Sequence, residues 1–511
     1  MKKTFIIAVL LTIACSAMAQ MPAFRTGKFN KSMNYIESGE ARIVSCEGNE
    51  IVMATNSTIS VLGMKATNGI QALVTDTNLN VLRQVNIPGT GYLDDVVYAN
   101  KVDGNLYILI RNRVFHNYRR VEVDIKSMTV AKVEDIVINH ATDSKRPAVA
   151  INNSDRIGDQ NTSLVSWCAK SDNNDYYGIV SIRINTVTNE TAQQQFLLDN
   201  KFQPLWTKQY DVRTLDDLKI DNNGVMYTLG TIYNTDKQKT LVCMSQLDVD
   251  NEQTIEQEYA EGMIAHLKIV NVQNGRVVAA GPVIHEYTRI KRTYDKLLAV
   301  AINTRDRSMK TATYDLSPED MSVFNNKDFN PKRNADYPEF IQMTHSVSTD
   351  NGGLALFQKS WDIFHYGGSS PDYHERCICG TVMMSIDSLG NIGWTKNFRS
   401  NYFEKTSFGE DPTYVSDVML MQVGGNIYFM QQEINGAKTV YPDTKFLNKL
   451  FNFSKHNLGV YCIAPDGQVT KALVKGSEAG SITGPFFRLG DNRYFTFYAS
   501  RKSSAPVYVK F

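Results

Sequence analysis

A short pattern recurs along the whole chain: a turn containing Gly, Asn or Asp, followed by alternating residues that favour β-strands. Its clearest copy is Lys101–Ile110, KVDGNLYILI. In each copy a residue that tolerates positive φ makes a tight hairpin turn, and the residues after it make a strand. Recurrence along a chain predicts a repeat architecture. The other copies are Glu47–Thr55, Asn222–Gly230, Gln273–Gly281, Asp350–Gln358, Val423–Gln431 and Gly490–Tyr498.

A second element follows each copy and consists of a strand, a short polar turn and another strand. The clearest example is Thr381–Trp394, TVMMSIDSLGNIGW. We interpret Thr162–Lys170 as one more copy of the strand that follows the turn, in which the turn glycine has been lost. Together the two elements give four antiparallel strands per unit in about eight units. This pattern predicts an all-β fold, a β-propeller of about eight four-stranded blades, with seven blades as the alternative.

The two ends of the chain predict how the ring closes. The last unit stops after the strand Ala505–Phe511 and lacks a fourth strand. The segment Pro22–Glu37 precedes the first unit and is free to supply it. Such pairing removes an exposed sheet edge.

The strand–turn–strand element resembles the degenerate repeats of quinoprotein-type and kelch-like propellers. Ser385–Trp394, SIDSLGNIGW, also resembles the Asp-box of sialidase-like propellers, although Gly390 follows Asp387 by three residues instead of two. The resemblance covers most of the chain after its first residues. It implies the fold and a secreted bacterial propeller, and it implies no particular reaction.

The first residues are typical of a bacterial export signal. Lys2 and Lys3 precede the apolar stretch Phe5–Ala14, and Ala17 and Ala19 form an A-x-A cleavage site. We therefore expect a signal peptide over residues 1–19 and a single propeller domain over 20–511, in the periplasm, at the cell surface or secreted. A lipid anchor on Cys15 is the less favoured alternative, and no later segment is apolar enough to span a membrane.

Charge and motifs exclude several function classes. The chain has 54 Lys and Arg against 53 Asp and Glu, a net charge of +1, which argues against nucleic acid as a partner. It lacks the G-x-S-x-G, H-E-x-x-H, phosphate-loop and dinucleotide-binding motifs. No catalytic residue and no cofactor is therefore assigned, and the balance leans against an enzyme.

The longest connections between strands are predicted to lie on one face of the ring. In a propeller the tight turns within each hairpin share one face, and the remaining connections emerge on the other. One-sided insertions in a repeat protein typically mark its binding face. The predicted loops are Leu316–Glu339, His285–Tyr294, Trp361–Arg376 and Ile434–His456.

Two of these loops carry aromatic and histidine side chains that suit sugar rings or a protein partner. The alternative is that these residues pack the insertions against the ring. His365, His374, Cys377 and Cys379 are residue types that bind Zn²⁺, but the Cys-x-Cys spacing is not that of a zinc knuckle. The candidate ligand-binding residues are Trp361, Phe364, His365, Tyr366, Tyr373, His374, His285, Tyr287 and Tyr294.

A set of acidic and histidine residues precedes or begins the innermost strands, at the predicted mouth of the central channel. Clustered carboxylates there would hold Ca²⁺ or a cationic group, whereas the competing interpretation is that each Asp caps a turn. The candidates are Asp94, Asp95, Asp216, Asp217, His266 and Asp417, with His345 at a similar place.

The sequence therefore supports three functions. The favoured one is an exported binding protein that recognises a glycan or an envelope or extracellular protein through one face. The second is a glycoside hydrolase or lyase that uses the channel-mouth aspartates. The third is a structural component of a surface assembly.

Overall fold

The structure is a computed structural model of the chain. It describes residues 21–28, 30, 41–61, 64–112, 117–137, 162–185, 191–210, 214–234, 239–287, 292–324, 340–367, 370–407, 418–434, 456–474, 481–490, 493–500 and 503–511. The expected signal peptide, Cys15 and Asp417 lie outside these residues.

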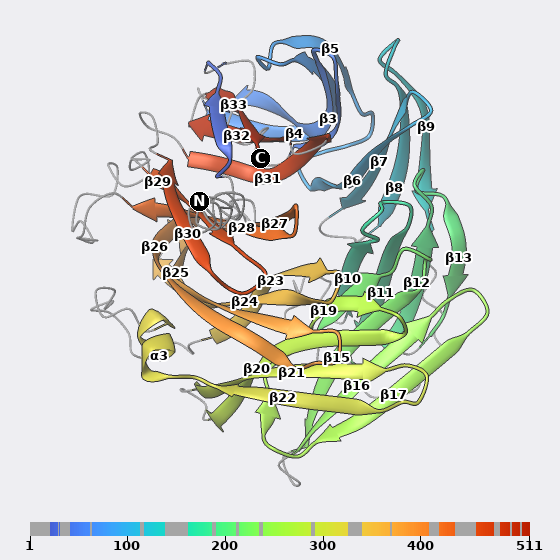
Figure 1. Cartoon of the computed structure of the whole chain (residues 1–511). Helices are drawn as coiled ribbons and strands as arrows, with labels where there is room; N and C mark the ends of the chain where they lie inside the picture. Colours follow the sequence, from blue (N-terminus) through green and yellow to red (C-terminus); the bar gives the residue numbers. More distant parts are fainter. Residues whose placement is uncertain are drawn as a thin grey trace, which may run out of the picture.

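Within the described chain the strands form eight antiparallel sheets that follow one another around the molecule (Figure 1). Blades 1 to 4 take their strands in sequence order. They are β2 (Arg42–Glu47), β3 (Glu50–Val61), β4 (Met64–Asp76) and β5 (Val81–Asn86); β6 (Asp94–Val102), β7 (Asn105–Asn112), β8 (Tyr118–Asp124) and β9 (Thr129–Ile136); β10 (Thr162–Lys170), β11 (Tyr177–Asn185), β12 (Thr191–Leu198) and β13 (Pro204–Lys208); and β14 (Asp217–Ile220), β15 (Met226–Asn234), β16 (Lys239–Leu247) and β17 (Glu252–Tyr259).

Blades 5 to 7 continue this order, and blade 8 contains the end of the chain. Their strands are β18 (Met263–Ile264), β19 (Lys268–Gln273), β20 (Arg276–Tyr287), β21 (Arg292–Asn303) and β22 (Met309–Asp315); β23 (Phe340–Thr349), β24 (Gly352–Gly367), β25 (Ser370–Asp387) and β26 (Ile392–Ser407); β27 (Val418–Val423), β28 (Asn426–Ile434), β29 (His456–Ile463) and β30 (Val469–Val474); and β31 (Ser481–Gly490), β32 (Arg493–Ser500) and β33 (Ser503–Lys510).

The first strand of the chain completes the last blade. β1 (Ala23–Thr26) pairs antiparallel with β33, from Ala23 opposite Lys510 to Thr26 opposite Val507. In Figure 1 the blue start of the chain accordingly lies with the red end. The chain is an eight-bladed β-propeller, and the predicted closure is confirmed.

Residues with positive φ form the turns between the first and second strands of the blades. Asp103 and Gly104 have φ values of 53° and 84°, and Asn274 and Gly275 have 53° and 74°. Two consecutive residues with positive φ are the signature of the hairpin turn that matches strand twist. Each such pair joins the innermost strand of a blade to the second strand.

Thr162–Lys170 was predicted as the second strand of its blade, and this prediction is wrong. This segment is β10, the first strand of blade 3, and the fourth strand is β13. Its turn is longer, because Ser171 N–H donates to the Tyr176 carbonyl at 2.9 Å and Asn174 takes the left-handed conformation with φ 59°. Asparagine tolerates this conformation, so no glycine is needed there.

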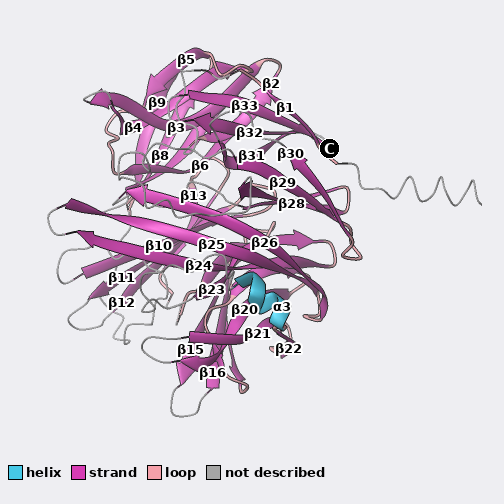
Figure 2. Cartoon of the chain, turned by 90° about the vertical axis from the view of Figure 1, so that its left-hand side faces the viewer, coloured by secondary structure: helices cyan, strands magenta, loops and turns pink. Residues whose placement is uncertain are grey.

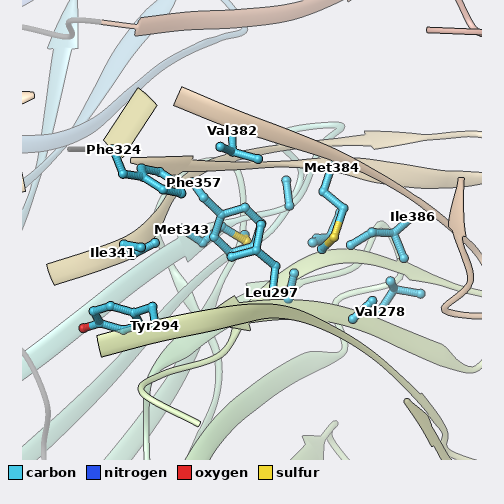
Figure 3. Close-up of a cluster of buried hydrophobic side chains, with 14 of the residues drawn as sticks. Val278, Tyr294, Leu297, Phe324, Ile341, Met343, Phe357, Val382, Met384 and Ile386 are labelled. Carbon is cyan, nitrogen blue, oxygen red and sulfur yellow. The ribbon is translucent and has the colours of Figure 1, made fainter. Parts of the chain in front are cut away.

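Each blade buries both faces against its neighbours. In β7 the five residues Leu106–Ile110 are all buried, as expected of a strand between two packed sheets. Figure 3 shows the core between blades 5 and 6, where Phe357, Met384 and Leu297 meet. Burying a side chain of this size contributes about 1.5–3 kcal/mol.

Part of the predicted loop Leu316–Glu339 is the helix α3 (Pro318–Phe324), which lies beside β25 and β26 (Figure 2). Ser317 caps it, since its Oγ accepts from the Asp320 N–H at 3.1 Å and Asp320 Oδ2 accepts from the Ser317 N–H at 2.9 Å. Phe324 is fully buried in the core of Figure 3. No helix in the described chain is long and apolar enough to cross a membrane.

Candidate functional site

The strand order fixes which connections share a face. Because all strands within a blade are antiparallel, the turn between the first and second strands and the turn between the third and fourth lie at one end. We call this end the turn face. The connections between the second and third strands, and those between blades, lie at the other end, which we call the hairpin face.

Blade 6 extends furthest toward the hairpin face. Its strands β24, β25 and β26 have 16, 18 and 16 residues, against eight residues in β7 and nine in β28. These long strands run across the middle of Figure 2. The segment Trp361–Arg376, predicted as a loop, is therefore mostly a continuation of the sheet. Its aromatic and β-branched residues favour strands, and pairing within the hairpin satisfies its backbone groups.

The backbone register aligns the candidate residues of this extension. Trp361 pairs with Cys377, which pairs with Phe403 on β26, and His365 pairs with Tyr373. Phe364 pairs with His374 in the same way, and Tyr366 lies next to His365 on β24. The side chains of these residues lie outside the described part of the chain. The cysteines proposed as zinc ligands are both on β25.

The predicted loop His285–Tyr294 is also a hairpin, formed by β20 and β21, with residues 288–291 outside the described part. Tyr287 pairs with Arg292 through the backbone. His285 is exposed, and its Nδ1 lies 3.3 Å from Asp295 Oδ2. Tyr294 is 6% exposed and packs in the core of Figure 3. His285 is thus exposed to solvent, whereas Tyr294 belongs to the core.

Asp94 and Asp95 begin β6, and both carboxylates interact with arginine. Asp94 Oδ2 accepts from the Gly91 N–H at 2.8 Å and from Arg119 at 3.0 Å, and its Oδ1 accepts from Asn112 at 3.0 Å. Arg111 lies 3.7 Å from Asp95. Asp94 therefore caps a turn, as the competing interpretation predicted, and it also forms an ion pair with Arg119.

Asp216 and Asp217 join blade 4 to blade 5. Asp216 Oδ2 accepts from Thr231 Oγ1 at 2.9 Å and from the Leu267 N–H at 3.1 Å. Asp217 Oδ2 accepts from the Ile269 N–H at 2.7 Å. Burial raises the pKa of Asp216 to about 7 and also raises the pKa of Asp217. Asp216 is thus a carboxyl group that titrates near neutral pH.

The two histidines occupy the next inner strands. His266, just before β19, accepts through Nε2 from the Met343 N–H at 3.2 Å and so connects blade 5 to blade 6. Its backbone can approach β20 because position 281 is glycine; a Cβ there would lie 2.0 Å from the His266 carbonyl oxygen. His345 lies on β23, where burial lowers its pKa to about 4, with a smaller effect from the charge of Lys268.

The aspartates do not lie at one level along the axis. Asp217 pairs with Leu229, whereas Asp95 pairs with Arg111, which lies two residues further from its turn glycine. Asp95 is therefore closer to the hairpin face than Asp217. Among the described residues no group of three or more His, Cys, Asp or Glu side chains is arranged to hold a metal ion.

The inner strands also carry basic residues that sequence reasoning did not single out. Lys219 on β14 donates to Ser348 Oγ on β23 at 2.7 Å, so it links blade 4 to blade 6. The positive charge of Lys268 on β19 offsets part of the rise in the pKa of Asp217 and adds to the lowering of the pKa of His345. Polar and apolar residues alternate along β14, and this alternation in the sequence was the available signal.

Comparison with known proteins assigns the chain to no family. No family model matches the chain, and no curated protein matches it. Many solved structures do, among them the Dos1 propeller (9% identity, 95% of each chain covered, TM-score 0.39) and the WD40 domain of SCAP from fission yeast (5% identity, 97% of each chain, TM-score 0.36). A third is the polysaccharide lyase Uly1, with 10% identity over 83% of this chain and 93% of that one and a TM-score of 0.35.

Proposed function

We propose that this protein is an exported binding protein that recognises a glycan on its hairpin face. The observation that carries the proposal is the three-stranded extension of blade 6, made by strands of 16, 18 and 16 residues. The other elongated hairpins, β3–β4 and β20–β21, point to the same face because they join second and third strands.

The composition of the extension fits a sugar ligand. Its register places aromatic residues on neighbouring strands, with Trp361 and Phe403 flanking Cys377 and with His365 opposite Tyr373. Flat aromatic rings with polar edges bind the apolar faces of sugar rings while leaving hydroxyl groups able to form hydrogen bonds. A sheet also positions such residues more rigidly than a loop, which lowers the entropic cost of binding. A protein of the envelope or the extracellular space is the alternative ligand.

The proposal is tested by glycan-array binding followed by calorimetry on the protein without residues 1–19. The double variant Trp361→Ala, Tyr366→Ala is expected to weaken binding of the selected glycan at least tenfold. Leu389→Ala is the matched control, since Leu389 is 45% exposed and lies in the β25–β26 turn of the same blade on the turn face. Equal affinities for the wild type and the double variant would remove the extension from the binding site.

A second candidate is a glycoside hydrolase or lyase that uses Asp216. The specific observation is that burial raises its pKa to about 7, as a general acid requires, while Oδ1 is buried without a partner. This candidate predicts turnover of a polysaccharide that is lost in Asp216→Asn. Turnover that survives this substitution would exclude Asp216 from the reaction.

A further inference from the structure

The outer strand of blade 6 has a long edge that no described strand covers. β26 has 16 residues, whereas the outer strands of the other blades, β1, β5, β9, β13, β17, β22 and β30, have four to eight. On one side β26 pairs with β25, and on its other side it pairs with no strand of the described chain. The backbone N–H and C=O groups along such an edge can pair with a strand of another molecule.

This edge is regular where it lies beyond the ring. The inner strand β23 pairs with β24 only up to Ser360, so the residues past that level belong to the three-stranded extension alone. A shift in register places Ser400 and Asn401 opposite a single residue of β25, and bulges of this kind protect sheet edges. Past the bulge, Tyr402–Ser407 pairs with β25 at every residue. We call the side of Tyr402–Ser407 that faces away from β25 the open edge.

Charged residues alternate in sign across the extension. The register aligns Asp362 of β24, Arg376 of β25 and Glu404 of β26 in one row. In the next row Glu375 of β25 pairs with Lys405 of β26. Opposite charges on directly paired residues stabilise a sheet, and like charges destabilise it. Both rows end on a charged residue at the open edge, so the best partner strand places a positive residue opposite Glu404 and a negative residue opposite Lys405.

The segment Tyr402–Ser407, YFEKTS, meets this requirement itself. When two copies pair antiparallel about a two-fold axis between residues 404 and 405, Glu404 of each copy lies opposite Lys405 of the other. The same register sets the two aromatic residues of each segment opposite the Thr and Ser of the other, and aromatic residues pair well with β-branched ones. Each copy uses the same patch, so the contact closes after two copies.

Antiparallel pairing also keeps the two rings apart. β26 follows the β25–β26 turn on the turn face, so it runs toward the hairpin face. In the second copy β26 runs the opposite way, and its ring therefore lies at the far end of the joined strands. Because a strand advances about 3.3 Å per residue, the paired segment separates the near ends of the two rings by roughly 20 Å.

We propose that Tyr402–Ser407 pairs with the same segment of a second copy and that the protein is a dimer with one six-stranded sheet across both extensions. The proposal goes beyond the glycan-binding function and does not depend on it. β24 lies at each outer side of this sheet, so Trp361 and Tyr366 of both copies are two strands away from the contact. The dimer would therefore carry the proposed glycan site twice.

The test is sedimentation equilibrium of the protein without residues 1–19. We expect the wild type to dimerise, and Glu404→Lys and Lys405→Glu each to raise the dissociation constant roughly tenfold or more, since each puts two like-charged pairs into the contact. An equimolar mixture of these two variants should recover most of the affinity, because every charged pair between the two different variants is of opposite sign. Asp135→Lys is the matched control, since Asp135 is exposed on β9, the outer strand of blade 2, and it should leave the dissociation constant unchanged.

Mixing separates the contact from an effect on folding, because a fold damaged in one variant is not repaired by the other. Thermal unfolding midpoints measure such damage directly. If either reversal unfolds the protein, the neutral variant Glu404→Gln, Lys405→Gln takes its place. It adds no like-charged pair, and it should weaken the dimer at least about twofold.

Three results would overturn the proposal. They are a wild type that stays monomeric at every concentration reached, a dimer whose dissociation constant neither reversal changes, and folded single variants whose mixture does not dimerise. The second result would place the contact elsewhere, such as at the β24 edge of the extension. The Trp361→Ala, Tyr366→Ala variant should remain dimeric whether or not it binds a glycan, so failure of the proposed function and failure of the dimer are distinguishable.

Discussion

Asp216 of blade 4 accepts a hydrogen bond from the backbone N–H of Leu267 in blade 5 at 3.1 Å. The same two sheets are also joined by the Asp217–Ile269 hydrogen bond and by apolar side chains such as those of Leu229 and Ile269. The Asp216–Leu267 contact also places a carboxyl group where water does not reach Oδ1. The Asp216 side chain therefore links two blades, and its raised pKa makes the stability of the fold depend on pH.

Asp216→Asn should change how stability depends on pH. Burial raises the folded-state pKa to about 7, above the usual value of 3.8, so the native state binds the extra proton between these values. The contribution of Asp216 to stability is present at low pH and is lost as pH rises from about 4 to 7. Relative to wild type, the variant should gain on the order of 2–4 kcal/mol over that interval. Urea unfolding at pH 4.5, 6 and 8 measures this, and a constant difference would contradict it.

His345→Gln should have the opposite signature. Burial lowers the folded-state pKa to about 4 from 6.5, so the native state resists protonation that the unfolded chain accepts. The contribution of His345 is present above pH 6.5 and is lost as pH falls toward 4. The variant should therefore become more stable relative to wild type on acidification, by up to about 3 kcal/mol. His285→Gln, at an exposed position, is the control variant; equal pH profiles for His345→Gln and wild type would refute the assignment.

Removal of the closing strand should destabilise the ring. β1 covers the edge of β33, and the Gly27 N–H donates to the Pro506 carbonyl at 2.8 Å beyond the strand itself. A chain that begins at residue 31 exposes this edge, which promotes self-association. We expect a midpoint lower by roughly 2–4 °C, from a loss of about 2–4 kcal/mol, and aggregates in size-exclusion chromatography. A chain that begins at Ala23 is the control, and indistinguishable behaviour of the two would disprove the closure role.

The fold was predictable because its signals are local. Asp103 with Gly104 and Asn274 with Gly275 mark their hairpin turns by residue type alone. Blade 3 was misassigned because its turn relies on Asn174, and one asparagine among several polar residues is a weak signal. The long strands of blade 6 were predicted as a loop, since Trp361–Arg376 mixes aromatic, charged and proline residues, and only pairing with β26 makes its sheet character evident.

The surroundings of Asp216 were only half predictable. The position of Asp216 before a strand drew attention to it, but the same reasoning grouped it with Asp94, which the structure pairs with Arg119. Whether an aspartate is neutralised depends on residues far away in sequence. Leu267, whose N–H donates to Asp216, belongs to the next blade, so the surroundings of Asp216 depend on the ring and not on any local pattern.

Lys219 and Ser348 should be energetically coupled although 129 residues separate them. The Lys219 Nζ–Ser348 Oγ distance is 2.7 Å, and burial lowers the pKa of Lys219, so the bond replaces lost hydration. Lys219→Met should cost about 1–3 kcal/mol, and Ser348→Ala should cost less, because Lys219 can still donate to the Val270 carbonyl. A double-mutant cycle in urea should give a coupling energy of about 0.5–1.5 kcal/mol. Lys239→Met with Glu258→Ala is the matched control, since that pair of 3.0 Å is exposed and lies within one blade. Strict additivity of Lys219→Met and Ser348→Ala would mean that blades 4 and 6 do not stabilise each other through this bond.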